Sequence, residues 1–462
     1  MKRLLCIVIA AAAAFMLTAC GSAAPEADGD TVQTAETEYG FQVVTEVISE
    51  EVKADDGTVL LNGSYELPRL TLTATLDGEE VELVESEADA QKLAVRDAFN
   101  AEMEKYRQTV LSFFREISGW AKELYEVSLA DGFAWHSAFA DEVKVEKTYQ
   151  TPGGLLSIYA TGYSYTGGAH PNGSFKTWNF DLNTGEFIGY EDIAADEDEF
   201  RAAVVENILE QIREQGLSEY YYDDYDSYVR DLAYASVYFD ENGMTVLFEE
   251  YTMGPHSAGI PTFTVPYEYF IHLLNERGET LILPYLPQET LVLADFYEAQ
   301  ELWSYFDLVT MPLDYEKSAE VDGYVYNRVN YRDISTMAEL RALLLTRFDE
   351  PVVDDLLAPE ENGFAHYRDI DGVLYGVDAA RGSDLTRGEA TYAVELDADG
   401  NAGKVIATVE EYAGEPTLNE ETGRYEQTVA GYVTVEFPFV QTETARDSRI
   451  LKASGRRSGA SG

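Results

Sequence analysis

The sequence contains almost no cysteine. Of its 462 residues only Cys6 and Cys20 are cysteines. The chain beyond them can form no disulfide, no thiolate metal site and no cysteine nucleophile. Histidine is scarce too, and none of the five stands in an HExxH or HxH arrangement. GxSxG elbows, phosphate-binding loops and dinucleotide fingerprints are also missing. We therefore predict a protein that is not an enzyme and uses no cofactor.

Basic residues are few. Lysine and arginine number 32 against 85 acidic residues, which gives a net charge of −53. Such a charge repels nucleic acid and anionic wall polymers. It attracts cationic proteins and speeds their encounter, although acidity can also serve solubility alone. Because 45% of the residues are hydrophobic, the chain is not a disordered acidic tail and can form two or three cores.

The amino terminus has no apolar run long enough to span a membrane. A basic start is followed by a short apolar stretch at residues 4–16. The following LTAC, ending at Cys20, resembles a bacterial lipobox, which implies removal of residues 1–19 and a diacylglycerol on Cys20. A plain secretory cleavage site is the alternative. Residues 20–40 are small and acidic and predict a flexible tether to the extracytoplasmic face of the membrane.

The first half of the chain alternates strand and helix patterns. FQVVTEVIS and LTLTATL predict strands. A long helix should follow from a capping box at residues 86–89. One of its faces should be buried over about seven turns. The residues predicted for that face are Phe99, Met103, Tyr106, Val110, Phe113, Ile117, Trp120 and Leu124. The expected class is α+β, with antiparallel sheets packed on this helix.

The predicted domains follow from changes of pattern. We expect an amino-terminal α+β domain at residues 41–165 and a second domain at 166–287. A smaller α+β domain at 288–444 should follow, with one helix capped by Thr336 and Glu339. Residues 445–462 are basic, in contrast to the rest of the chain. They form either a basic tail or a frameshifted terminus, because a last strand is missing after FPFVQTET.

Two glycine–histidine segments are the most unusual features. YTGGAHPNGS covers residues 165–174, and YTMGPHSAG covers 251–259. Their composition predicts tight turns between strands, with buried imidazoles bonded to turn carbonyls. If Gly168 has a positive φ, a β-branched residue there would be strained. Alternatively, they contact a ligand or partner. The candidate binding residues are then Tyr165, Gly167, Gly168, His170, Asn172, Tyr251, Gly254 and His256. A third possibility is a metal held by His170 and His256 with an acid such as Glu250.

These two segments and their flanks resemble a paired-domain family of exported bacterial proteins that is named only as of unknown function. The family forms the ectodomain of the lysozyme-sensing anti-sigma-V factor and the amino-terminal part of certain peptidoglycan deacetylases. The resemblance covers about residues 41–274. It implies an α+β fold without chemistry of its own and, in the anti-sigma case, direct capture of lysozyme.

The last domain is similar to the IseA-type inhibitors of cell-wall DL-endopeptidases. This resemblance covers about residues 291–440 and depends on a DGVLY run and an RGSD run. Together the two resemblances imply a module that acts on enzymes of the cell wall.

The leading hypothesis is a non-enzymatic, lipid-anchored surface protein. It would bind, and in one version inhibit, lysozyme-like enzymes or DL-endopeptidases. Its other contact would be the membrane, through the lipid on Cys20, with no nucleic acid partner. One alternative is a peptidoglycan- or carbohydrate-binding module that stacks aromatic rings on sugars. The other is a metal-dependent hydrolase that uses His170 and His256.

Overall fold

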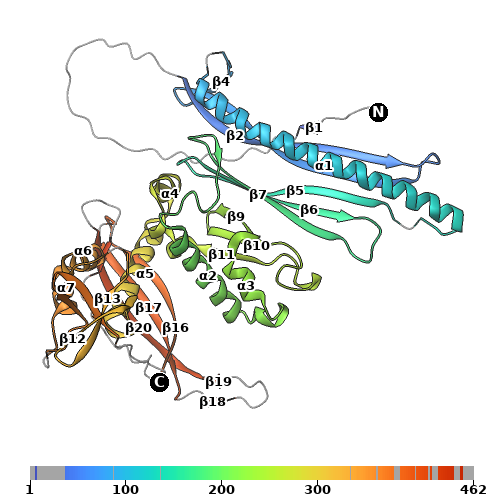
Figure 1. Cartoon of the computed structure of the whole chain (residues 1–462). Helices are drawn as coiled ribbons and strands as arrows, with labels where there is room; N and C mark the ends of the chain where they lie inside the picture. Colours follow the sequence, from blue (N-terminus) through green and yellow to red (C-terminus); the bar gives the residue numbers. More distant parts are fainter. Residues whose placement is uncertain are drawn as a thin grey trace, which may run out of the picture. The chain divides into compact units, whose positions relative to one another are not determined.

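The computed structural model divides the chain into two compact units, which are described separately (Figure 1). The first unit contains residues up to Pro266 together with Leu273–Tyr285, and the second contains Tyr267–His272 and the residues from Leu286 onward. The described residues are 6–7, 37–86, 88–135, 137–332, 334–360, 363–378, 386–400, 402–414, 417–418, 425–441 and 448–450. Cys20, His136 and the tail after residue 450 lie outside them. No helix in the described part is long and apolar enough to cross a membrane.

The first unit is built on one large sheet. Its strand order is β1-β2-β3-β5-β6-β7-β8, and β4 also pairs with β3. The strands are β1 (Cys6–Ile7), β2 (Thr37–Lys53), β3 (Val59–Leu76), β4 (Glu79–Val81), β5 (Phe139–Gln150), β6 (Leu155–Tyr165), β7 (Asn172–Asp181) and β8 (Glu186–Phe187). All pairs are antiparallel except β3 with β5. A helix connects these two strands, and such a crossover is what a parallel pair requires.

That connection is helix α1 (Ala90–Asp131), which runs along the large sheet (Figure 1). It begins after Asp89, whose side chain accepts the N–H of Gln91, so Asp89 alone is the cap in place of the predicted capping box. It ends at Gly132, which adopts a left-handed conformation with φ 72°. The residues that α1 buries are Val95, Phe99, Met103, Val110, Phe114, Ile117, Ala121 and Tyr125.

The predicted buried face of α1 was wrong in its second half. Phe113, Trp120 and Leu124 are 39%, 46% and 45% exposed. Each is followed directly by a residue that is buried instead, because apolar residues here occur in neighbouring pairs. Two apolar stripes then lie side by side, and the 3.6-residue period is compatible with burial of either one. The sheet covers one stripe, and the other stays at the surface of the first unit.

The rest of the first unit is a smaller layer of helices and strands. Its sheet has the antiparallel order β11-β10-β9. The elements are α2 (Glu197–Glu214), α3 (Tyr225–Arg230), β9 (Ala235–Asp240), β10 (Gly243–Phe248), β11 (Thr262–Pro266) and α4 (Glu276–Ile282). Strand β9 lies against the large sheet, because Ser157 of β6 accepts the backbone N–H of Phe239 and the rings of Tyr159 and Tyr238 stack at 4.8 Å. The loop between β6 and β7 contains the position where we placed a domain boundary.

In its described residues the second unit packs three helices with two four-stranded sheets, in the orders β12-β13-β15-β14 and β16-β17-β20-β21. Its helices are α5 (Gln288–Asp307), α6 (Met337–Arg347) and α7 (Glu350–Leu357). Its strands are β12 (Leu313–Val321), β13 (Tyr324–Val329), β14 (Tyr367–Ile370), β15 (Val373–Val377), β16 (Arg387–Leu396), β17 (Ala402–Tyr412), β18 (Thr417–Leu418), β19 (Tyr425–Glu426), β20 (Val429–Gln441) and β21 (Ser448–Ile450). The short 3-10 helices of the described residues are η1 (Leu217–Tyr220), η2 (Leu232–Tyr234), η3 (His256–Ala258), η4 (Tyr267–Tyr269), η5 (Ile271–Leu273) and η6 (Leu283–Tyr285).

Two sequence details of the second unit can be compared with this structure. The cap of α6 is confirmed, since Thr336 accepts the N–H of Glu339 and the Glu339 carboxylate accepts the N–H of Ser335. The strand that we took to be missing is present: β21, in the basic segment, pairs with the end of β20. The predicted α+β class, with antiparallel sheets and one long helix, is confirmed.

The second unit also contains a buried group of charges, here called the glutamate cluster: Glu298 of α5, Arg332 and Arg347. The side chains are only 7%, 19% and 11% exposed. Glu298 accepts hydrogen bonds from both guanidinium groups, the one from Arg347 Nε at 2.6 Å. Burial alone would raise the pKa of Glu298, but Arg347 and Arg332 outweigh it and lower that pKa. The Glu298 carboxylate is therefore ionised and held between two guanidinium groups.

Candidate functional site

The two glycine–histidine segments meet in the first unit. His170 lies in the loop between β6 and β7, and His256 begins η3 in the loop after β10. Their imidazole rings stack, with centroids 4.0 Å apart and planes 19° apart. The ring of Tyr251 lies 5.8 Å from that of His256 and nearly parallel to it. We call these three residues, together with Glu250, the histidine corner.

Glycines allow the two loops to approach each other. Gly167, not Gly168, has the positive φ, at 86°. A Cβ on Gly167 would also lie 2.9 Å from the ring of Phe139, whereas one on Gly168 would meet nothing closer than 3.8 Å. A Cβ on Gly173 would lie 2.7 Å from Oε1 of Glu250. The bare backbone at Gly173 therefore makes room for the Glu250 carboxylate, which contacts His256.

The imidazoles are less buried than we predicted. His170 is exposed, contrary to the prediction of a buried ring. Its Nδ1 lies 3.0 Å from the carbonyl oxygen of Pro171, so the predicted contact with a turn carbonyl is present. The side chain of His256 is 36% exposed, but its Nδ1 is buried. That atom lies 3.4 Å from Oε2 of Glu250 without hydrogen-bond geometry. The loops are short and irregular, and they leave the outer ring in solvent.

Two neighbouring carboxylates, Glu249 and Glu250, place negative charge at the histidine corner. Glu250 is 13% exposed and contacts His256. Burial raises the pKa of Glu249, and the adjacent charge of Glu250 raises it further, while Lys176 acts in the opposite direction. Two carboxylates therefore lie side by side here, with Lys176 as a nearby cation.

The arrangement does not suit a shared metal ion. A histidine binds a metal through a lone pair in its ring plane, at about 2.0–2.1 Å. Stacked, nearly parallel rings cannot both direct such lone pairs at one ion between them. In the described part of the chain no group of three histidine, cysteine, aspartate or glutamate side chains could hold a metal. The predicted convergence of His170 and His256 is real, but its geometry is that of a stack.

The other candidate residues have different positions. Asn172 is exposed at the start of β7, and Tyr165 is half-buried at the end of β6. Tyr251 is 48% exposed and has φ 67°, a strained conformation for a bulky residue. Gly254 is buried, and a Cβ there would lie 2.9 Å from the carbonyl oxygen of Tyr220. Tyr251 is therefore part of the exposed ring stack, whereas Gly254 allows the backbone of two segments to pack closely.

Sequence analysis missed two features of this chain. Gly173 belongs to the first glycine–histidine segment, but its close approach to the Glu250 carboxylate was not predicted. That contact joins positions far apart in the sequence. A cavity in the second unit, described below, was missed entirely. Its wall combines ordinary core residues of α5 and α7 with one residue of β20. No local pattern distinguishes such residues from those of a filled core.

Comparison with known proteins gives matches for both loops. A family model described as a protein of unknown function (DUF3298) matches residues 191–268, which include His256. A model described as deacetylase PdaC matches residues 86–173, which include His170. Each imidazole of the stack therefore comes from a different matched segment, and the predicted paired-domain resemblance is confirmed. No curated protein matches the chain.

Two solved structures are similar to part of the chain. A DUF3298 family member from Bacteroides fragilis is 14% identical, with a TM-score of 0.37, over 54% of this chain and 97% of that one. A DUF3298 family protein from Pseudomonas aeruginosa is 12% identical, with a TM-score of 0.30, over 53% of this chain and 96% of that one. The resemblance of residues 291–440 to IseA-type inhibitors stays a prediction.

Proposed function

We propose that this protein is a lipid-anchored, cell-wall-associated protein of the bacterial surface that binds cationic proteins, among them lysozyme-like or wall-lytic enzymes. The matches to DUF3298 and deacetylase PdaC support the association with the cell wall. The contact is made at the histidine corner. Binding there blocks the partner enzyme when the corner covers its catalytic groups.

The observation that carries this proposal is the exposed ring stack above a carboxylate. A planar guanidinium or an ammonium group packs favourably on aromatic faces, and more strongly where a carboxylate lies close by. Tyr251 and His170 offer such faces, and Glu250 supplies the negative charge. An arginine or lysine of a partner protein would satisfy all three groups at once.

The charge of the whole chain acts in the same direction. A net charge of −53 steers cationic proteins toward the surface and raises their association rate, most strongly at low salt. The long-range field selects partners only by sign. The corner would add the short-range contact that makes one orientation preferred.

The test is binding of purified protein, residues 20–462, to lysozyme and to cell-wall endopeptidases of the source bacterium at low and moderate salt. Wild type should bind at least one of them, and Tyr251→Ala should weaken that binding about tenfold, as the loss of one stacking contact would. Tyr432→Ala is the matched control, because Tyr432 is 61% exposed in the second unit. Absence of binding in every condition would refute the proposal.

A carbohydrate-binding module is the competing class, and the first unit does expose tyrosines such as Tyr220 and Tyr222, at 66% and 43%. Sedimentation with insoluble peptidoglycan separates the two classes. Retention on peptidoglycan that survives moderate salt, together with no binding to cationic enzymes, would favour the module. The negative charge predicts poor retention on anionic walls.

The anchor has its own test. Wild-type protein should incorporate a tagged fatty acid in cells, and Cys20→Ala should not. Cys6→Ala is the control, because Cys6 lies within the segment that we expect to be removed. Equal labelling of wild type and Cys20→Ala would contradict the lipid anchor without affecting the binding proposal.

A further inference from the structure

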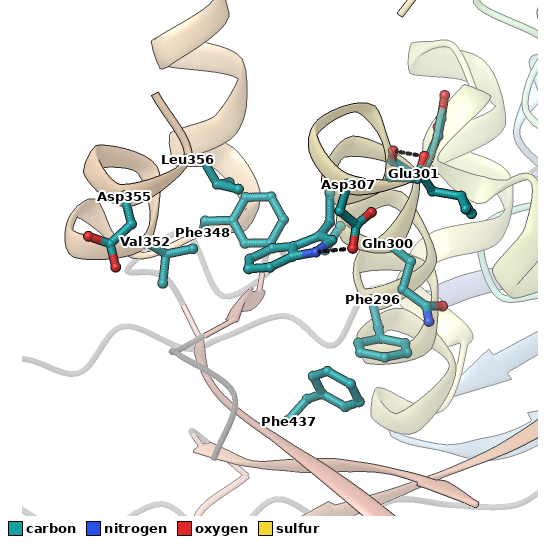
Figure 2. A pocket seen from close by; sticks show the side chains of 13 residues that line it. Phe296, Gln300, Glu301, Asp307, Phe348, Val352, Asp355, Leu356 and Phe437 are labelled. Atoms are coloured by element: carbon teal, nitrogen blue, oxygen red, sulfur yellow. Dashed lines mark hydrogen bonds between the residues drawn. The ribbon is translucent and has the colours of Figure 1, made fainter. Parts of the chain in front are cut away.

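The second unit contains a cavity of about 820 Å³. Helix α5, the segment around α7 and strand β20 line it, and Figure 2 shows the rings of Phe296 and Phe437 next to each other at its edge. Its size is in the range of pockets that bind small organic molecules. The lining residues that matter here are Phe296, Trp303, Asp307, Phe348, Val352 and Phe437.

The floor of the cavity belongs to the hydrophobic core. Phe296, Phe348 and Val352 are 2%, 3% and 6% exposed and are members of the core cluster of the second unit. The rings of Phe296 and Phe437 lie 5.0 Å apart. Protein interiors rarely leave openings much larger than a water molecule. An opening of this size, cut into a core, is typical of a site that receives an apolar group.

An exposed tryptophan stands at the side of the cavity in a fixed orientation. Trp303 is 43% exposed, and its ring lies 6.0 Å from that of Phe348. Its indole N–H donates a hydrogen bond to Oδ2 of Asp307 at 3.0 Å (Figure 2). The bond holds the indole plane and places a carboxylate beside it. An indole face next to a carboxylate is a favourable environment for an ammonium group.

The charges that line the cavity are all negative. Glu301, Asp307 and Asp355 contribute carboxylates, and the described lining residues include no lysine, arginine or histidine. The Glu301 carboxylate accepts hydrogen bonds from Arg332 and Tyr331, so its charge is balanced. For Asp307 the contact shown is the neutral indole of Trp303. This carboxylate lies beside the indole and is the one that a cation on that ring would meet.

We propose that this cavity binds a small organic cation, a molecule with an apolar body and one ammonium group. The apolar body lies against Phe296, Val352 and Phe437, and the ammonium group lies on the indole of Trp303 beside Asp307. Neutral and anionic molecules of the same shape lose the second contact. The proposal does not depend on the histidine corner, which belongs to the first unit.

The probe is decyltrimethylammonium, kept below its micellar concentration and titrated into purified protein by calorimetry. Decanesulfonate, which has the same chain and the opposite charge, is the matched comparison. The cation should bind with one site per chain and at least about tenfold more tightly than the sulfonate, since only the cation gains the indole and carboxylate contacts. Equal binding of both probes, or binding of neither, would overturn the proposal.

Variants locate the site. Trp303→Ala and Asp307→Asn should each weaken binding of the cation about tenfold. Trp120→Ala and Asp223→Asn are the controls, because Trp120 is 46% exposed and Asp223 is also exposed, both in the first unit. Circular dichroism establishes that each variant is folded. If the controls weaken binding as much as the site variants, the cation binds elsewhere.

The basic segment at the end of the chain is a competing occupant. Deletion of residues 451–462 should leave the affinity for decyltrimethylammonium unchanged within about twofold if the cavity receives a separate molecule. Binding that appears only after the deletion would assign the cavity to the chain itself and overturn the proposal.

Discussion

The glutamate cluster of the second unit and the histidine corner of the first are both groups of polar side chains drawn together from distant segments. They differ in how exposed their side chains are and in how closely cations surround their carboxylates. Glu298 is 7% exposed and lies between two arginines that neutralise it. The corner leaves His170 in solvent and keeps Glu250 without a hydrogen bond to the buried Nδ1 of His256.

This difference separates a structural role from a binding role. A buried charge is tolerated only when partners compensate it, so removing one member of the glutamate cluster should be costly to the fold. An exposed group contributes little to stability and remains able to meet a partner. Substitutions should therefore affect unfolding in one cluster and binding in the other. The predictions below test that separation, from the largest expected effect to the smallest.

The largest effect is expected for Glu298→Ala. The change leaves Arg332 and Arg347 buried without their shared carboxylate, which should cost about 3–5 kcal/mol of unfolding free energy. Chemical denaturation followed by circular dichroism measures it, and the transition of the second unit should move to lower denaturant. Glu210→Ala is the control, because its pair with Arg213 is exposed and should contribute no more than about 1 kcal/mol. Equal effects of the two variants would end the distinction between the clusters.

A smaller loss is expected where the backbone frames the histidine corner. Gly167→Val places a β-branched residue at φ 86°, with its Cβ 2.9 Å from Phe139, and should cost about 2 kcal/mol. Gly168→Val should stay within about 0.5 kcal/mol, since that glycine has no positive φ and open space around it. Thermal unfolding of the two variants checks the difference. If Gly168→Val were the more damaging of the two, the described loop conformation would be wrong.

Acid should lower the unfolding free energy by less than Glu298→Ala does, because a protonated Glu298 loses its charge but still fills its space. Since the folded protein lowers the pKa of Glu298, its stabilising contribution is present above the pKa of the unfolded chain and is lost as the pH falls through the folded pKa. Denaturation at a series of pH values measures this loss, and Glu298→Gln should remove part of the slope. If the unfolding free energy of Glu298→Gln depended on pH as steeply as that of wild type, Glu298 would not be the group responsible for this loss.

In the first unit, Asp141 should change stability with pH in the opposite direction to Glu298. Burial raises the pKa of Asp141, against the hydrogen bond that Tyr65 donates to it. Its folded form therefore favours the proton, and the stability it contributes is present below the pKa of the unfolded chain and is lost as the pH rises through the folded pKa. Asp141→Asn, which keeps an acceptor for Tyr65, should remove this part of the pH dependence.

The sequence was sufficient for the class of fold, whereas it offered the meeting of the two loops only as one possibility. Strand alternation and helical period report which residues a single element can bury, and the resemblance of the flanks linked the loops to one paired domain. Neither reports which of two apolar stripes faces the sheet, as Phe113 and Phe114 show. Exposure of His170 depends on the approach of two distant loops, and the cavity beside Trp303 depends on how α5, α7 and β20 pack. These are properties of tertiary packing, which local periodicity does not contain.

The smallest effect on stability, together with a clear loss of binding, is expected for His170→Ala. The imidazole is exposed and keeps one stacking partner and one turn carbonyl, so its loss should cost only about 0.5 kcal/mol of unfolding free energy. Calorimetric melting should therefore show little change, while affinity for a cationic partner should fall about tenfold. His170→Phe preserves a ring for stacking and should retain most of the binding. If His170→Ala instead lost several kcal/mol and kept its affinity, the corner would be a structural cluster like that of Glu298, and the binding surface would have to be sought elsewhere on the molecule.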